Sequence, residues 1–560
     1  MNINDTEAMM GVLSKAGHEI AASEEEADAV IVNTCAVRAK SEDKLYGKLG
    51  QLKAVKKRKK RLLVGVCGCV AEKNALELLT HKEVDFVFGT RAITRVDELL
   101  GRAESGERFI EMGDFIDELD SDTPRIRTSM HHAWITIIFG CNKFCSYCIV
   151  PYTRGREKSR NMNDILSEAR GLAENGYREI TYLGQNVDSY GKDLEDGSSL
   201  AKLIRETTEI NGIERIWFLT SYPRDFSDEL IDVIASSEKV SRAIHLPVQS
   251  GSNRVLKDMN RGYTREYYLD LIGRVKNKIK GASLSTDLII GFPGETEKEY
   301  EETVSLVKEV RFERVNLAMY SPREGTLSAK KMEDDVPPEV KTKRLNDLLA
   351  IQKHINREEN EKYLDRIIDV IPSSDKVSRA IHLPVQSGSN RVLKDMNRGY
   401  TREYYLDLIG RVKNRIQGAT LSTDLIIGFP GETDEEYEET VSLVKEVRFE
   451  RVNLAMYSPR EGTLSAKKMK DDVPPEVKTK RLNDLLAIQK HINREENEKY
   501  LNETIDVIGE GKVKGNGKIY GRTINNKIVI YEAEPDLIGQ PVKIRIERVS
   551  AGPLYGVMVK

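Results

Sequence analysis

Apolar and polar positions alternate in blocks along most of the chain, so that short apolar runs are followed by longer segments with helical spacing. Near the amino terminus a helical pattern covers 5–17, and apolar runs at 29–34 and 62–66 predict strands with amphipathic helices between and after them. This alternation predicts a small α/β domain over residues 1–115.

The same alternation resumes on a larger scale from residue 127. Six strand-like runs, each followed by a helical segment, lie at 134–139, 180–183, 216–219, 244–248, 285–290 and 315–319. Six βα units in series predict a partial, partly closed (βα)6 barrel over residues 127–367, with functional loops at the carboxyl ends of its strands. The residues at those ends are Cys141, Gln185, Ser221, Gln249, Gly291 and Ser321.

The chain then repeats itself. Residues 231–367 recur at 368–504, a period of 137 residues with eleven differences, which indicates a tandem duplication or an assembly error rather than a stacked repeat. Each copy supplies three strands, so only one can complete the front half of the barrel, residues 130–230. We expect the first copy to do so, because connections favour elements adjacent in sequence. The duplicated half-barrel, 368–500, then keeps exposed apolar edges.

The last segment, 501–560, has a different pattern. Short strand-like runs at 518–523, 527–531 and 542–547 are separated by Gly, Asn and Pro, which is typical of a small antiparallel barrel. Tyr520 could stack on a nucleic-acid base, although a solvated barrel surface explains it equally well. The cations that give this segment a basic side are Lys512, Lys514, Lys518, Arg522 and Arg545.

Composition narrows the class of protein. The 560 residues are 39% hydrophobic and 32% charged, with no apolar run long enough to cross a membrane and no signal-peptide pattern, so we expect a soluble cytoplasmic protein. Six cysteines in such a chain do not form a disulfide framework. The net charge of -3 says little about partners, but 56–61 and 154–160 are locally basic. Such runs are more often solvated faces than binding sites.

Three of the cysteines stand in one short loop. Cys141, Cys145 and Cys148 have the spacing C-x3-C-x2-C, which can hold a 4Fe-4S cluster and leave its fourth iron without a protein ligand. An iron with an open position can bind S-adenosylmethionine and support radical chemistry. The alternative is a structural zinc site, which normally shows a second pair of ligands that does not follow here. Tyr147 could pack on an adenine ring or serve as a core aromatic.

With these motifs in hand, the chain resembles the radical-SAM methylthiotransferases, and within them the MiaB-like tRNA-2-methylthio-N6-dimethylallyladenosine synthases. The resemblance covers nearly the whole chain apart from the extra copy. The segments that carry it are Asn33–Arg38, Gly68–Glu72, Gly140–Arg160, Leu183–Gly191, His245–Ser252 and Tyr320–Thr326.

The resemblance implies three domains: an amino-terminal methylthiotransferase domain with a second 4Fe-4S cluster, the radical-SAM barrel, and a carboxyl-terminal TRAM domain that binds RNA. It implies insertion of sulfur and then a methyl group at C2 of an isopentenylated adenosine beside the anticodon, with S-adenosylmethionine as source of both the radical and the methyl group. The implied partners are the tRNA anticodon stem-loop and an electron donor such as flavodoxin or ferredoxin, with no membrane.

Carried over to this sequence, the resemblance makes Cys141, Cys145 and Cys148 the ligands of the S-adenosylmethionine-binding cluster, and Cys35 and Cys69 ligands of the auxiliary cluster. The residues expected to bind S-adenosylmethionine are Tyr147, Gln185, Asn186, Gln249, Asp287 and Gly291. No residue is assigned as catalytic.

The family's third auxiliary cysteine precedes a Gln-Met-Asn segment, and this sequence begins at Met1 and Asn2, so that cysteine and the first strand of its domain are expected to be missing. Cys67 is expected to be a passenger rather than a replacement, because cluster ligands must surround a cube. Two other functions stay open: methylthiolation of a ribosomal protein, which shares the chemistry, and a non-catalytic RNA-binding relic.

Overall fold

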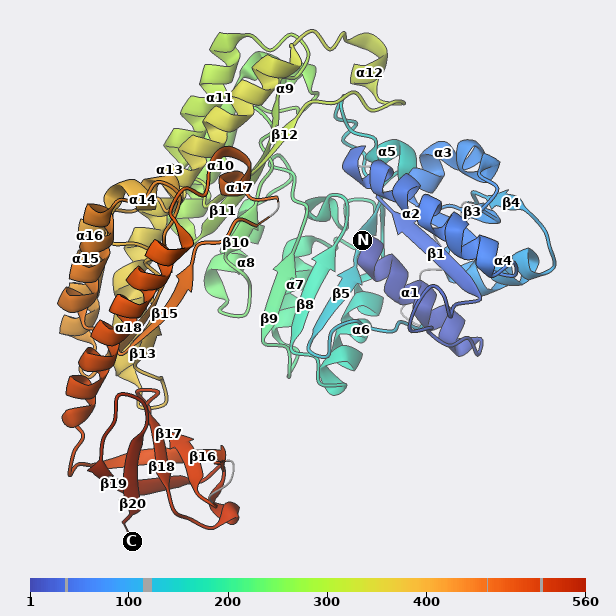
Figure 1. Ribbon diagram of the computed structural model, residues 1–560. Coiled ribbons are helices and arrows are strands. Elements are labelled where there is room, and N and C mark those ends of the chain that lie inside the picture. Colours follow the sequence, from blue (N-terminus) through green and yellow to red (C-terminus); the bar gives the residue numbers. More distant parts are fainter. Residues whose placement is uncertain (36–38, 114–122, 461, 514–516, 560) are drawn as a thin grey trace. The chain divides into compact units, whose positions relative to one another are not determined.

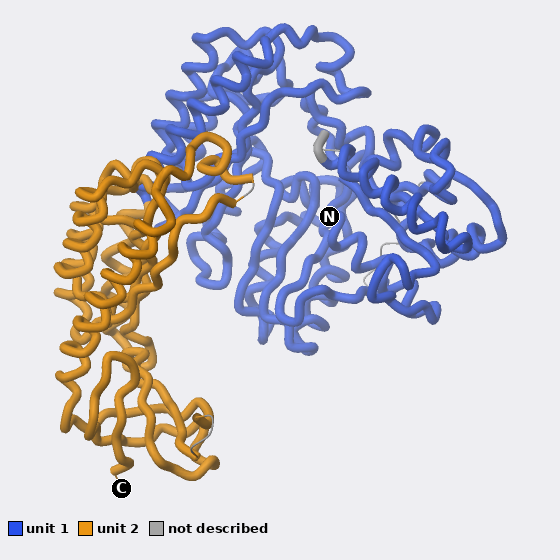
Figure 2. Tube along the Cα trace, in the orientation of Figure 1, with its two compact units in different colours: residues 1–359 blue, residues 360–560 orange. Residues whose placement is uncertain are grey.

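The computed structural model describes residues 1–35, 39–113, 123–460, 462–513 and 517–559 (Figure 1). The chain divides into two compact units, 1–359 and 360–560, which we call unit 1 and unit 2 (Figure 2). Within the described residues, no helix is both long enough and apolar enough to cross a membrane.

Unit 1 begins with an α/β layer domain built on a parallel sheet of order β1-β2-β3-β4. Leu45 and Leu49 of α2 pack on one side of this sheet with α3, while Phe88 and the helices α1 and α4 form a second cluster. Strands β3 and β4 are three residues each, too short for their apolar pattern to predict them. The elements are α1 (Asn2–Lys15), β1 (Ala29–Thr34), α2 (Ala39–Arg58), β2 (Leu63–Gly68), α3 (Cys69–Thr80), β3 (Phe86–Phe88), α4 (Val96–Glu104) and β4 (Phe109–Glu111).

The barrel of unit 1 consists of two three-stranded parallel sheets, β5-β8-β9 and β10-β11-β12. Ile216 of β9 pairs with Val240 just before β10, and its amide donates to the Lys239 carbonyl oxygen at 2.8 Å. One continuous core contains residues of both sheets, from Ile135 to Ile355. The first copy therefore completes the front half, as the order of the chain predicts.

The predicted strand 134–139 is divided in the structure. Its first part is β5, and residue 137 separates this from β6, which pairs antiparallel with β7. The elements of the front half are β5 (His132–Thr136), β6 (Ile138–Phe139), α5 (Val150–Thr153), β7 (Lys158–Ser159), α6 (Met162–Glu174), β8 (Glu179–Leu183), α7 (Leu200–Thr208) and β9 (Arg215–Phe218). Those of the first copy are α8 (Asp228–Ser236), β10 (Ala243–His245), α9 (Asn253–Asp258), α10 (Arg265–Lys278), β11 (Ser283–Ile290), α11 (Glu297–Val310), β12 (Arg314–Met319) and α12 (Leu327–Lys331).

The two copies are joined through one continuous helix, α13 (Pro338–Val370), and the boundary between the units falls inside it. Ile355, near the middle of α13, belongs to the core of the first copy, whereas Ile368, near its end, belongs to the core of the second. Asp365 pairs with Arg411 at 2.7 Å. This ion pair repeats the one between α8 and α10 of the first copy, so the end of α13 substitutes for a separate first helix of the second copy.

The second copy forms its own parallel sheet, β13-β14-β15, with its own core in unit 2. Positions that the front half covers in the first copy are more open here: Val240 is 3% exposed and its counterpart Val377 is 36% exposed. The expected open apolar face is therefore present. The elements are β13 (Ala380–His382), α14 (Asn390–Asp395), α15 (Arg402–Arg415), β14 (Thr420–Ile427), α16 (Asp434–Val447), β15 (Arg451–Met456), α17 (Leu464–Lys468) and α18 (Pro475–Glu498).

The chain ends in a closed five-stranded barrel of order β16-β17-β18-β20-β19, which confirms the predicted small barrel. The pairing is not wholly antiparallel as predicted, because β18 and β20 are parallel. Asn497 of α18 donates to the carbonyl oxygens of Ser550 at 2.8 Å and Gly552 at 3.0 Å, and Lys527 pairs with Glu450. These contacts hold the barrel to the second copy. Its strands are β16 (Thr504–Lys512), β17 (Ile519–Arg522), β18 (Ile528–Tyr531), β19 (Pro541–Arg548) and β20 (Leu554–Met558).

The duplication allows the two cores to be tested with one matched substitution. Ile355 is 3% exposed and its counterpart Ile492 is 4% exposed, each in a different core. Truncation of a buried isoleucine to alanine costs roughly 2–5 kcal/mol. We expect Ile355→Ala to raise the rate of hydrogen exchange in unit 1 and Ile492→Ala to raise it in unit 2. Equal effects of both variants on both units would contradict two separate cores.

Candidate functional site

The cysteine loop begins where β6 ends, and a glycine makes its entry possible. Gly140 has φ of 71°, and a Cβ there would lie 2.0 Å from the carbonyl oxygen of Arg156. Only glycine allows this close approach in a left-handed conformation. The amide of Cys141 donates to the Gly155 carbonyl oxygen at 3.0 Å, so the loop returns on itself and presents its thiols from one short segment.

Main-chain hydrogen bonds attach this loop to the first copy. The Ser146 amide donates to the Met259 carbonyl oxygen at 3.0 Å, and its hydroxyl donates to the Asp258 carbonyl oxygen at 2.7 Å. The amide of Ser328 donates in turn to the Ser146 carbonyl oxygen at 2.8 Å. The position of the cysteines is therefore set by residues more than a hundred positions away in the sequence.

Arg261 of the first copy lies beneath the loop. Its guanidinium donates to Sγ of Cys145 at 3.4 Å, to the Tyr147 hydroxyl at 3.3 Å and to the Pro247 carbonyl oxygen at 2.6 Å. It is 4% exposed, and burial opposes its charge, but Tyr147, Tyr263 and Cys145 together hold the pKa of Arg261 above its ordinary value. Sequence reasoning did not identify Arg261, because only the fold brings it to the loop.

The donor set of the loop fits an iron–sulfur cluster. Burial raises the pKa of Cys141 to about 11 and that of Cys148 to about 12, so metal binding must displace the protons. Within the described part of the chain, no three His, Cys, Asp or Glu side chains converge on the position of a single metal ion. A 4Fe-4S cluster binds each thiolate at a different iron, so its ligands stand around a cube. The spacing of these three cysteines agrees with that cluster.

Of the predicted cofactor-binding residues, Gln185, Asn186, Gln249 and Gly291 follow strand ends, Tyr147 lies in the cysteine loop, and Asp287 lies within β11. Gln185 Oε1 and Asn186 Oδ1, just beyond β8, are buried acceptors for which the described residues offer no hydrogen-bond partner. Gln249 adopts φ of 77°, and its main-chain N–H donates to the main-chain carbonyl oxygen of Asp287 at 2.9 Å. A Cβ at Gly291 would lie 2.4 Å from the Lys341 side chain. Buried acceptors without a partner are the groups that a polar ligand would satisfy.

Two carboxylates beside these residues were not predicted. Asp225 accepts hydrogen bonds from Lys143 of the cysteine loop, from Lys192 and from Asn186, at 2.6–2.7 Å. Burial opposes the charge, but these donors outweigh it and lower the pKa of Asp225 to about 2. Burial raises the pKa of Asp188 to about 7, although the Tyr222 amide and the Ser221 hydroxyl donate to it. Asp188 lies within the segment Leu183–Gly191 that carries the resemblance, but no motif marks Asp225, whose partners come from separate loops.

A second pair of predicted ligands lies at the ends of β1 and β2. These strands are adjacent and parallel, so Cys35 and Cys69 follow neighbouring strand ends. Arg154, six residues beyond Cys148, donates to Sγ of Cys69 at 3.3 Å and to Asp5 at 2.8 Å. The contact joins the amino-terminal domain to the barrel. The rest of the predicted motif, residues 36–38, lies outside the described residues.

Cys67 has a different environment. Its Sγ lies 3.9 Å from Sδ of Met9, it is fully buried in the cluster around Phe86 and Phe88, and burial raises its pKa well above the ordinary value. These contacts agree with the interpretation of Cys67 as a passenger in the core.

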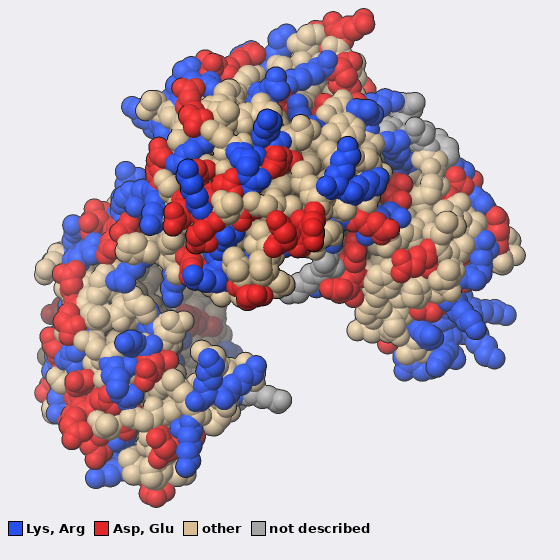
Figure 3. Space-filling view, turned by 90° about the horizontal axis from the view of Figure 1, so that it is seen from above, with Lys and Arg blue, Asp and Glu red and all other residues tan. Residues whose placement is uncertain are grey.

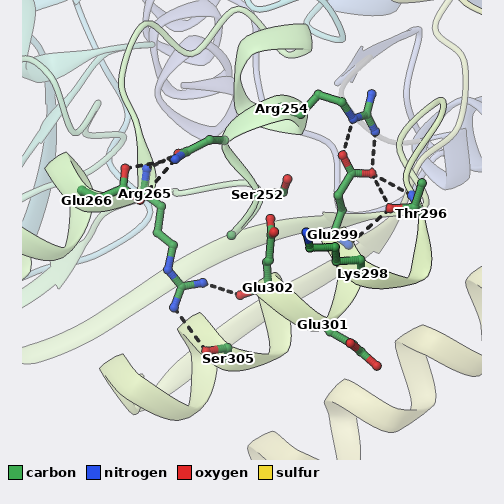
Figure 4. A pocket seen from close by; sticks show the side chains of 12 residues that line it. Ser252, Arg254, Arg265, Glu266, Thr296, Lys298, Glu299, Glu301, Glu302 and Ser305 are labelled. Atoms are coloured by element: carbon green, nitrogen blue, oxygen red, sulfur yellow. Dashed lines mark hydrogen bonds and ion pairs between the residues drawn. The ribbon is translucent and has the colours of Figure 1, made fainter.

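One surface groove of the first copy lies apart from the cysteine site. It has a volume of about 610 Å³ and is lined by α9, α10 and α11, where Arg254 pairs with Glu299 and Arg265 donates to Ser305 (Figure 4). The second copy has a similar groove of about 660 Å³. Because its charged side chains pair with one another and both copies carry it, the groove belongs to the half-barrel and not to the cluster site.

Comparison with known families agrees with this arrangement. Residues 135–307 and 337–444 match the Radical SAM superfamily, residues 1–89 match the Uncharacterized protein family UPF0004, and residues 498–559 match the TRAM domain. A tRNA-2-methylthio-N(6)-dimethylallyladenosine synthase from Thermotoga petrophila is 58% identical over 371 residues, 66% of this chain and 83% of the relative. The chain belongs to the radical-SAM methylthiotransferase family.

Other relatives with the same name match the same share of this chain. The protein from Pseudothermotoga lettingae is 53% identical over 66% of this chain and 85% of its own length, and that from Acetivibrio thermocellus is 45% identical over 66% and 78%. Among solved structures, a radical S-adenosylmethionine methyltransferase, TsrM, from Kitasatospora setae has a TM-score of 0.44 at 14% identity and covers 57% of this chain and 70% of its own. That similarity is too low to support an inference.

The position of Arg261 gives a test with a matched control. Arg398, its counterpart in the second copy, keeps the bonds to Tyr400 and Pro384, and no hydrogen bond from it to a cysteine is found among the described residues. We expect Arg261→Ala to reduce the iron bound after anaerobic reconstitution by at least about half, because Cys145 and Tyr147 lose their common donor. Arg398→Ala should leave it unchanged. Iron analysis and visible absorption measure both, and equal losses would contradict closure by the first copy.

Asp188 predicts a pH dependence of stability. Its pKa in the folded state, about 7, is above its unfolded value, so the unfolded chain releases the proton first. The stability associated with the neutral form is complete below pH of about 4 and is lost as pH rises towards 7. We expect Asp188→Asn to become progressively more stable than the parent over this range. Thermal unfolding of both proteins measures the difference, and a constant difference would contradict the shift.

Proposed function

We propose that this chain is a tRNA methylthiotransferase that adds a methylthio group at C2 of N6-dimethylallyladenosine next to the anticodon, by radical S-adenosylmethionine chemistry. The observation that carries the proposal is the cysteine loop, which Ser146 and Arg261 attach to the first copy. The chain is also 58% identical to a tRNA-2-methylthio-N(6)-dimethylallyladenosine synthase. The relatives named above are all tRNA synthases of this kind, which disfavours a ribosomal-protein substrate.

In this proposal Cys141, Cys145 and Cys148 ligate a 4Fe-4S cluster, which when bound supplies the electron that activates S-adenosylmethionine. Arg261 orients the loop through Cys145 and lies against Tyr147. The proposed S-adenosylmethionine site consists of Tyr147, the residues Gln185, Asn186, Gln249 and Gly291 beyond strand ends, and Asp287 within β11. The buried walls of the barrel keep water and other reactants away from the reacting groups.

We further propose that Cys35 and Cys69 hold the auxiliary cluster and that Arg154 orients Cys69. A guanidinium donor to a ligating sulfur stabilises its thiolate form. Formation of this second cluster separates an active enzyme from the RNA-binding relic.

The domain assignment follows from the same reasoning: 1–115 for the methylthiotransferase domain, 127–367 for the radical-SAM barrel, 368–500 for the duplicated half-barrel and 501–560 for TRAM. The TRAM segment would bind the tRNA, and an electron donor such as flavodoxin or ferredoxin would reduce the cluster. Free thiol ligands suit a reducing cytoplasm.

The substrate is tested by offering the reconstituted protein isopentenylated tRNA and, separately, the ribosomal-protein substrate, with mass spectrometry of the products. We expect the methylthio group on the tRNA alone. Product on the ribosomal protein alone would overturn the assignment.

The number of clusters is tested by iron and sulfide analysis after anaerobic reconstitution. Two clusters correspond to about eight irons per chain and one to about four. We expect about eight, with Cys69→Ala losing about half and Cys67→Ala losing none. About four irons together with absent methylthiolation would support the relic instead.

A further inference from the structure

The end of helix α2 carries a group of cations that the proposed chemistry does not use. Residues 53–61 contain seven Lys and Arg and no Asp or Glu, whereas the chain as a whole has a net charge of -3. Lys56 and Lys59 turn inward to Asp85 and to the Glu26 and Ala27 carbonyl oxygens. The other five are exposed and form what we call the α2 basic patch: Lys53, Lys57, Arg58, Lys60 and Arg61.

Helix stability explains only part of this pattern. Cations in the last turn of a helix are favoured by its dipole, but Lys60 and Arg61 lie beyond the end of α2 at Arg58. Lys53 and Lys57 are four residues apart on the helix, a spacing at which like charges repel by a few tenths of a kcal/mol. The helix dipole therefore does not account for the whole run of cations.

The patch is also poorly neutralised by its neighbours. Arg58 forms an ion pair with Glu25 at 3.8 Å, but the two side chains are 71% and 64% exposed. Such an exposed pair contributes little to stability. On the face shown in Figure 3, acidic and basic side chains are mixed over most of the surface, and Lys and Arg gather at one edge, at the lower right. Exposed cations that lie this close together in the chain attract a polyanion.

The cations predicted on the carboxyl-terminal barrel are different. Lys518 pairs with Glu532 at 3.1 Å, Arg522 with Glu510 at 3.0 Å, and Arg545 with Glu547 at 3.0 Å. Each must exchange an internal partner for a phosphate before it can bind RNA, whereas the α2 basic patch need not. Lys514 lies outside the described residues. The α2 basic patch is thus less neutralised than these three barrel cations.

The apolar face of α2 decides which polyanion fits. Its leucines at 45, 49 and 52 are at most 1% exposed in the core, so no apolar stripe is left to enter a lipid surface. Helix α2 starts at Ala39, four residues after Cys35, and its 20 residues extend about 30 Å. Its basic end therefore lies about one helix length from the auxiliary cysteine site, a distance that an RNA stem can span.

We propose that the α2 basic patch binds the phosphate backbone of the tRNA substrate, as a second RNA contact separate from the carboxyl-terminal barrel. This inference rests on the proposed function and extends it to the amino-terminal domain. The contact is electrostatic and does not depend on base sequence, so it should contribute to affinity and salt dependence rather than to the choice of adenosine.

The test compares two quadruple variants of the full chain. One neutralises the patch by Lys53→Gln, Lys57→Gln, Lys60→Gln and Arg61→Gln. The control neutralises the same number of exposed lysines in unit 2, at Lys394, Lys445, Lys480 and Lys490. Binding of full-length tRNA is measured over a range of salt concentrations, and iron content confirms that both variants retain their cluster.

We expect the patch variant to bind tRNA at least about tenfold more weakly at low salt, and the slope of log K against log salt to fall by roughly three, since each phosphate contact contributes about 0.7–0.9. The control variant should keep the slope of the parent. The proposed tRNA contact alone would be overturned by equal slopes for the patch variant and the parent. It would also be overturned if the patch variant lost binding to phosphatidylserine vesicles without losing tRNA binding. Failure of the parent chain to bind tRNA would overturn the proposed function as well.

Discussion

The site depends on a single contact between parts distant in sequence, the attachment of the cysteine loop to residues 258–261. Arg261 reaches Sγ of Cys145, and the main chain of Met259 accepts from Ser146. A loop with three free thiols has little structure of its own, because its thiols make weak hydrogen bonds and its main chain must find partners elsewhere. The first copy supplies those partners. Without it the cysteines would keep their spacing but lose their common orientation.

The duplication shows which part of this contact comes from sequence and which from position. Arg261 and Arg398 have identical neighbours in the chain, and both donate to a tyrosine and to a proline carbonyl oxygen. Only Arg261 has a cysteine loop to bind among the described residues. The difference arises because the β9 edge of the front half, at Ile216, pairs with Val240 of the first copy, which follows it directly in the chain. A residue's chemistry is therefore not sufficient to assign its function.

The same consideration applies to the join between the copies. Residues 365–370 are the end of a long helix in the structure, although their counterparts 228–233 lie in the short, separate helix α8. After Pro338 at the first position of this helix, no Pro or Gly occurs up to residue 370, so the helical hydrogen bonds continue through the seam. The duplicated unit is thus accommodated without a new linker. The cost is the open face at Val377, which the front half would otherwise cover.

The sequence by itself determined the cysteine spacing, the order of strands and helices, the repeat and the small carboxyl-terminal barrel, because these follow from local spacing and from the period of apolar residues. It did not reveal the short strands β3 and β4, Arg154 beside Cys69, or Asp188 and Asp225 near the site. Only the tertiary structure decided these. Hydrogen bonding, burial and charge neutralisation act between residues that folding brings together, and a linear pattern contains no measure of that distance.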